Sequence, residues 1–75
     1  MMTIIKRYDI TIEEDIPEEL EKQLVEKVKQ RAQVDESFAC DRFHIQLEAI
    51  YREMLGDPQE MSYNMIDWYI QPNYE

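Results

Sequence analysis

The residues best suited to chemistry are Cys40, His44 and Glu48, which follow one another at intervals of four. On a helix, this spacing would point three ligating or nucleophilic side chains in similar directions. Two of them can share a metal ion, but the first and third Cα atoms would lie about 12 Å apart along the axis. A zinc site would therefore need carboxylates as further ligands, because the chain has only one Cys and one His.

The chain has few residues that could support nucleophilic catalysis. His44 is the only histidine, so any Ser–His or Cys–His pair must use it. No segment near Cys40 suggests the oxyanion donors that acyl transfer requires. The single glycine, Gly56, excludes a glycine-rich phosphate loop. We therefore expect no enzyme activity, no metal and no cofactor. On this interpretation Cys40 is a small core residue, and Glu48 pairs with His44 and Arg52 on a solvated helix flank.

Negative charge is the dominant property of the sequence. Seventeen Asp and Glu residues oppose eight Lys and Arg, which gives a net charge of -9 over 75 residues. Residues 13–21, E-E-D-I-P-E-E-L-E, contain six acids and no base. Such a field repels nucleic acid and anionic membranes and attracts basic protein surfaces. The one basic cluster, Lys27, Lys29 and Arg31, is interpreted as compensation for a helix dipole.

Length and composition indicate one domain covering residues 1–75. Hydrophobic residues make up 44% of the chain, which is enough to fold without a disulfide staple. The single cysteine excludes an internal disulfide and indicates a reducing compartment, so we expect a cytoplasmic protein. No stretch approaches the roughly 20 apolar residues of a membrane span, and we expect no membrane contact.

The elements that must position these residues follow from hydrophobic periodicity. Residues 3–12 alternate with Ile4, Ile10 and Ile12 on one parity, which predicts a single half-buried strand. A helix over about 17–33 follows, and Asp15 with Glu18 has the spacing of a capping box.

A second helix is expected after a short connection. Asp35 and Ser37 are its two candidate N-caps, and Gly56 ends it. Its apolar stripe consists of Cys40, Phe43, Leu47, Ile50, Tyr51 and Met54. The short link between the two helices predicts an antiparallel hairpin.

Two interpretations remain for residues 58–70. A short helical turn can precede a strand in which Ile66, Trp68 and Ile70 alternate with outward residues. Alternatively, one helix places Met61, Met65 and Trp68 on a single face. We favour the turn and strand. The predicted fold class is thus α+β, with a helix hairpin packed on a two-stranded antiparallel sheet.

Two functions from different classes fit these features. In size, charge and lack of catalytic residues the chain resembles the small inhibitors that phages and mobile elements use against restriction, CRISPR or DNA-repair enzymes. It would then act as a nucleic-acid mimic on a partner with a basic surface, such as a nuclease. The alternative is a host accessory, adaptor or dimerisation domain that pairs through a strand edge and whose acidity only keeps it soluble. The candidate contact residues are Glu13, Glu14, Glu19, Glu21, Tyr63, Tyr69 and Tyr74.

We predict no detectable binding of DNA or RNA at physiological salt, because the net charge is -9 and the bases form one small cluster. Fluorescence anisotropy with labelled duplex and single-stranded probes measures this directly. Micromolar binding of either probe would remove the premise of nucleic-acid mimicry.

Overall fold

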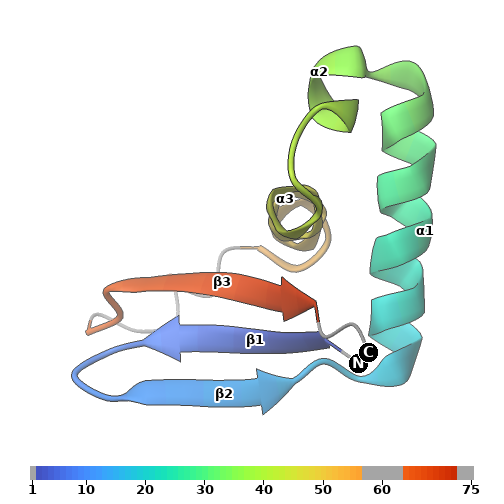
Figure 1. Ribbon diagram of the computed structural model, residues 1–75. Coiled ribbons are helices and arrows are strands. Elements are labelled where there is room, and N and C mark those ends of the chain that lie inside the picture. Colours follow the sequence, from blue (N-terminus) through green and yellow to red (C-terminus); the bar gives the residue numbers. More distant parts are fainter. Residues whose placement is uncertain (1, 57–63, 73–75) are drawn as a thin grey trace.

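The computed structural model describes residues 2–56 and 64–72 and has an α+β fold (Figure 1). The antiparallel strands β1 (Met2–Arg7), β2 (Thr11–Asp15) and β3 (Asp67–Pro72) form a sheet in the order β2-β1-β3. The helices are α1 (Glu18–Val34), α2 (Glu36–Ala39) and α3 (Phe43–Leu55). Helix α3 lies over β3, and α1 leaves the end of β2 and rises steeply away from the sheet (Figure 1).

The predicted strand over residues 3–12 is in fact a hairpin, so the sheet has three strands among the described residues where two were expected. The chain reverses at residues 8–10, where the amide of Tyr8 donates to the carbonyl of Ile10 at 2.8 Å. Ile10 is 69% exposed and Ile12 is also exposed, so neither reaches the core. The sequence hid this reversal because no Gly, Pro or Asn-Gly pair marks the turn and β-branched residues continue through it.

The core lies between one face of the sheet and the helices. Strand register places Ile4 of β1 opposite Ile70 of β3, and both are buried. Trp68 lies on the same face, 5.5 Å from the ring of Tyr51, and the guanidinium of Arg52 lies 4.8 Å above it. The buried cluster is Met2, Ile4, Ile16, Leu24, Val28, Phe38, Leu47, Ile50, Met65, Trp68 and Ile70. These contacts hold α3 on β1 and β3.

Helix α1 begins without the predicted capping box. Asp15 belongs to β2, and the N-cap residue is Pro17, whose side chain makes no capping hydrogen bond. The amide of Ile16 donates to the carbonyl of Met2 at 2.9 Å, so β pairing holds the backbone extended past Asp15. At its other end α1 is tied to α3 by Arg31, whose guanidinium contacts Glu53 at 2.8 Å.

The predicted second helix is interrupted. Asp35 caps α2 as expected, accepting from the amide of Phe38 at 3.1 Å, and Gly56 ends α3 with a φ of 84°. Between α2 and α3, Arg42 has extended backbone, with φ -65° and ψ 150°. The buried side chain of Gln46 donates to the carbonyl of Phe38 at 2.8 Å, and the same carbonyl accepts from the amide of Asp41 at 3.1 Å, which closes α2 with a short turn.

Of residues 58–70, for which two interpretations were open, the part from Asp67 onward is a strand. Trp68 and Ile70 are buried and Tyr69 is exposed in β3, which confirms the predicted alternation and excludes a single helix over 58–70. The prediction that Ile66 shares the buried face is wrong, since Ile66 precedes the strand and is exposed. The predicted helical turn falls on residues 57–63, which lie outside the described residues.

We predict that Leu24→Ala and Leu47→Ala each lower the free energy of unfolding by about 2–5 kcal/mol, because both leucines are fully buried. Val34→Ala, at an exposed position of the same helix as Leu24, should change it by less than about 0.5 kcal/mol. Urea denaturation measures all three variants. Equal stability of Leu24→Ala and Val34→Ala would contradict this core.

Candidate protein-binding surface

The two edges of the sheet differ in how their backbone groups are occupied. On the outer edge of β3, the amide of Ile70 donates to the Glu48 carboxylate at 3.1 Å. Pro72, two residues on, has no N–H to offer. A side chain from α3 and a proline therefore obstruct this edge against a further strand.

The edge at β2 carries no such obstruction among the described residues. Two backbone hydrogen bonds, from the amide of Tyr8 to the carbonyl of Ile10 and from the amide of Ile16 to the carbonyl of Met2, show which residues of β2 bond to β1. Along an antiparallel strand, residues whose backbone groups face the neighbouring strand alternate with residues whose backbone groups face away from it. The backbone groups of Thr11, Glu13 and Asp15 consequently point away from β1. Every residue of β2 is exposed.

The acids of residues 13–21 are divided between the two faces of the sheet. Glu13 lies opposite Ile5 and Asp15 opposite Thr3, on the face away from the helices. Glu14 lies on the helix side, where its carboxylate accepts from Lys6 at 2.9 Å. This hydrogen bond raises the pKa of Lys6 above its ordinary 10.5, although burial opposes it. The stabilisation is therefore present at neutral pH and is lost as the pH rises through the raised value.

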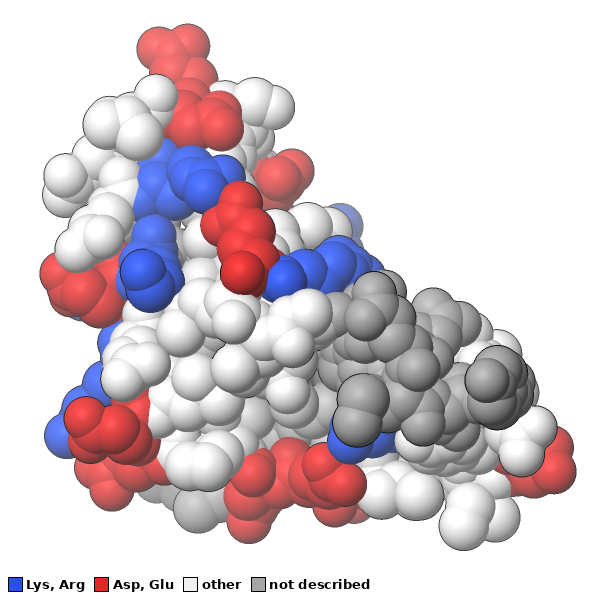
Figure 2. All heavy atoms as spheres, turned by 180° about the vertical axis from the view of Figure 1, so that it is seen from behind, with Lys and Arg blue, Asp and Glu red and all other residues white. Residues whose placement is uncertain are grey.

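Helix α1 continues this acidic surface beyond β2. Its first turn contains Glu18, Glu19 and Glu21. Glu18 lies 3.7 Å from Lys22, and Glu18 and Glu21 line a shallow depression together with Asp15 and Ile16. In the rear view, acids lie along the lower edge of the molecule and around α2 at the top, and bases gather between them (Figure 2).

Three of the six acids are not neutralised in the described part of the chain. No ion pair joins Glu13, Asp15 or Glu19 to a base there, whereas Glu14 and Glu18 each contact a lysine. We call Glu13, Asp15 and Glu19 the unpaired acids. Asp15 was expected to be a helix cap, so its place on this surface could not be recognised before the hairpin was known.

The structure brings one predicted aromatic residue onto the same face as Glu13. Ile5 is only 2% exposed, and its cross-strand neighbours are Glu13 on β2 and Tyr69 on β3. Tyr69 is 40% exposed. Of the other candidate contact residues, Tyr63 and Tyr74 lie outside the described residues.

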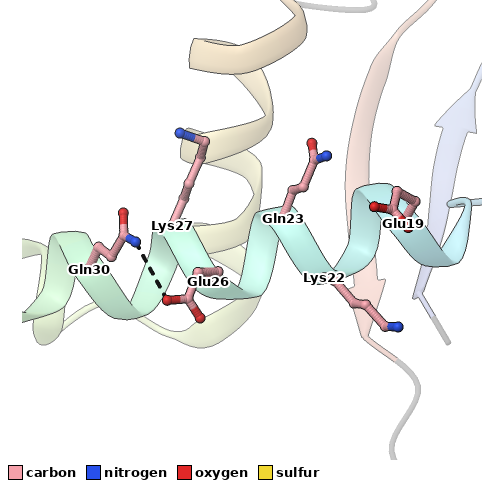
Figure 3. Close-up of a pocket in the computed structure, with 6 residues that line it drawn as sticks. All are labelled: Glu19, Lys22, Gln23, Glu26, Lys27 and Gln30. Atoms are coloured by element: carbon pink, nitrogen blue, oxygen red, sulfur yellow. Dashed lines mark hydrogen bonds between the residues drawn. The ribbon is translucent and has the colours of Figure 1, made fainter.

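The outward side of α1 differs from its acidic first turn. A shallow hollow there is lined by Glu19, Lys22, Gln23, Glu26, Lys27 and Gln30 (Figure 3). Gln23 and Lys27 project to one side of the helix and Lys22 to the other (Figure 3). Acids, amides and bases thus alternate along this side, unlike the first turn of α1, where Glu18, Glu19 and Glu21 gather.

The predicted row of Cys40, His44 and Glu48 does not form. Cys40 lies at the end of α2, outside α3, and is exposed rather than part of the core. The interpretation of Glu48 as a partner of His44 and Arg52 on a solvated flank is also wrong, since Glu48 binds the β3 backbone. In residues 2–56 and 64–72, no group of three or more His, Cys, Asp or Glu is placed to hold a metal ion.

Comparisons with protein-family models, curated proteins and solved structures found no match to this chain. None of the helices in the described residues has the length and apolar character needed to cross a membrane.

We predict that Glu48→Ala lowers the free energy of unfolding by about 1–3 kcal/mol, because it removes the acceptor of the Ile70 amide. Glu48→Gln keeps an acceptor oxygen and serves as the matched control, with a smaller loss. Amide hydrogen exchange at Ile70 should accelerate in the alanine variant and stay near the parent rate in the glutamine variant. Identical exchange at Ile70 in all three proteins would contradict the role of Glu48.

Proposed function

We propose that this protein is a small inhibitor that binds the basic nucleic-acid-binding groove of another protein, in the manner of phage or mobile-element anti-restriction and anti-CRISPR proteins. The observation that carries the proposal is the set of unpaired acids, with Glu13 and Asp15 on β2 and Glu19 in the first turn of α1. An acidic patch that served only as a helix cap would not need carboxylates on the preceding strand.

The spacing of the strand acids supports a partner that normally binds nucleic acid. Glu13 and Asp15 are two residues apart on β2, which separates them by about 6.8 Å along the strand. Two nucleotide steps along one DNA strand advance by about the same distance, at about 3.4 Å a step along the duplex axis. The spacing of the two carboxylates is therefore close to that of phosphates two steps apart, which a basic groove would normally bind.

Electrostatic complementarity favours fast and selective association with such a groove. Opposite potentials steer the encounter, and like charges repel competing acidic partners. The exposed Tyr69 supplies apolar contact area on the same sheet face as Glu13. The single cysteine suits a reducing compartment, and we place the interaction in the cytoplasm, where nucleic-acid-handling enzymes work.

The proposal is tested with a triple variant, Glu13→Gln, Asp15→Asn and Glu19→Gln, which removes the unpaired acids and changes the net charge from -9 to -6. A matched control, Glu26→Gln, Glu36→Gln and Asp41→Asn, changes the charge equally at exposed acids elsewhere. With a partner identified by affinity capture and mass spectrometry, association rates are measured at low and high salt. We expect the triple variant to associate about tenfold more slowly at low salt, with a weaker salt dependence, and the control to resemble the parent.

Two outcomes would overturn the proposal. Equal association rates for the triple variant and its control would leave the acids with a solubilising role only. Simultaneous binding of duplex DNA and this protein to the partner would exclude a shared basic groove and favour the accessory or adaptor alternative.

A further inference from the structure

The open edge of β2 has the backbone groups needed to bind another strand. Thr11, Glu13 and Asp15 each direct one N–H and one C=O away from β1, as the phase of the ladder requires. All three residues are exposed. The opposite edge is obstructed by Glu48 and Pro72, so strand addition is directed to β2.

A second copy of this chain does not suit the edge. A symmetric antiparallel pair of β2 strands, centred on Glu13, would place the two Glu13 side chains directly opposite each other, with Asp15 of each strand only two positions away. Like charges in directly opposed positions destabilise a strand pair. The same acids that prevent self-pairing attract a strand that carries the opposite charge.

The two faces of β2 specify the side chains of an incoming strand. Glu13 and Asp15 occupy the face away from the helices, and neither has an ion pair among the described residues. On the helix side the exposed Ile12 offers apolar area, and Glu14 is already neutralised by Lys6. An occupant that alternates basic and apolar residues would match both faces at once.

We infer that the β2 edge takes up an extended basic segment of the partner as a fourth strand, with Lys or Arg beside Glu13 and Asp15 and apolar residues beside Ile12. This inference rests on the proposed function, and it specifies the form in which the partner presents its basic residues. Backbone hydrogen bonds to Thr11, Glu13 and Asp15 supply affinity, and the alternating side chains supply selectivity.

The test uses a short peptide of alternating lysine and valine, together with two backbone-modified versions. One version is N-methylated at every lysine and the other at every valine, so charge and composition are retained while alternate N–H donors are removed. Lysine N–H groups face β2 in an antiparallel added strand, and valine N–H groups face it in a parallel one. We expect one methylated set to weaken binding about tenfold or more and the other to bind like the parent peptide. Calorimetry at low salt measures all three affinities.

Equal affinities of the three peptides would overturn the inference, because they would show attraction by charge alone. Absence of binding by the unmodified peptide would overturn it as well. Neither result bears on the proposed function, which is tested separately by competition with DNA and by the triple variant. In one outcome the triple variant associates with the partner as fast as the parent while the two methylated peptides still differ in affinity. That result would support the strand-binding edge and contradict the nucleic-acid-mimic function.

Discussion

The structure depends on the pairing of β1 with a strand on each side. Ile4 at the middle of β1 lies opposite Glu14 of β2 and Ile70 of β3, so the N-terminal strand β1 holds β2 and β3 in one sheet. This arrangement gives α3 an apolar surface to cover and leaves β2 and β3 as the two edges. The acidic surface and its open backbone groups exist only because β2 is displaced to the edge farther from α3.

The β2 and β3 edges of the sheet are protected in different ways. A side chain from α3 occupies the β3 edge through the contact between Glu48 and the Ile70 amide, whereas in residues 2–56 and 64–72 the β2 edge is protected only by its acidic side chains. Charge discriminates between partners, since it repels another acidic strand and attracts a basic one. We therefore expect the acids of β2 to oppose pairing with a second copy and to favour a basic strand.

Hydrophobic periodicity was sufficient to predict α1, the body of α3 and the alternation of Trp68, Tyr69 and Ile70 in β3. It failed at Tyr8 to Ile10, because a turn without Gly or Pro leaves the alternation unbroken. The interruption between α2 and α3 was also unpredictable. It depends on Phe38 reaching the core and on Gln46 binding the Phe38 carbonyl. The hydrogen bond from the Ile70 amide to Glu48 requires α3 to lie beside β3. The spacing of residues within one segment cannot predict such a contact between distant segments.

Hydrogen exchange in the complex with a captured partner tests this binding surface, because it reports which backbone groups the partner covers. We expect slower exchange at Thr11, Glu13 and Asp15, whose amides point away from β1, and at the first turn of α1. Amides that already pair with β1, such as that of Glu14, should change little by comparison. Slower exchange confined to α2 and α3, with β2 unchanged, would contradict the assignment of the binding surface.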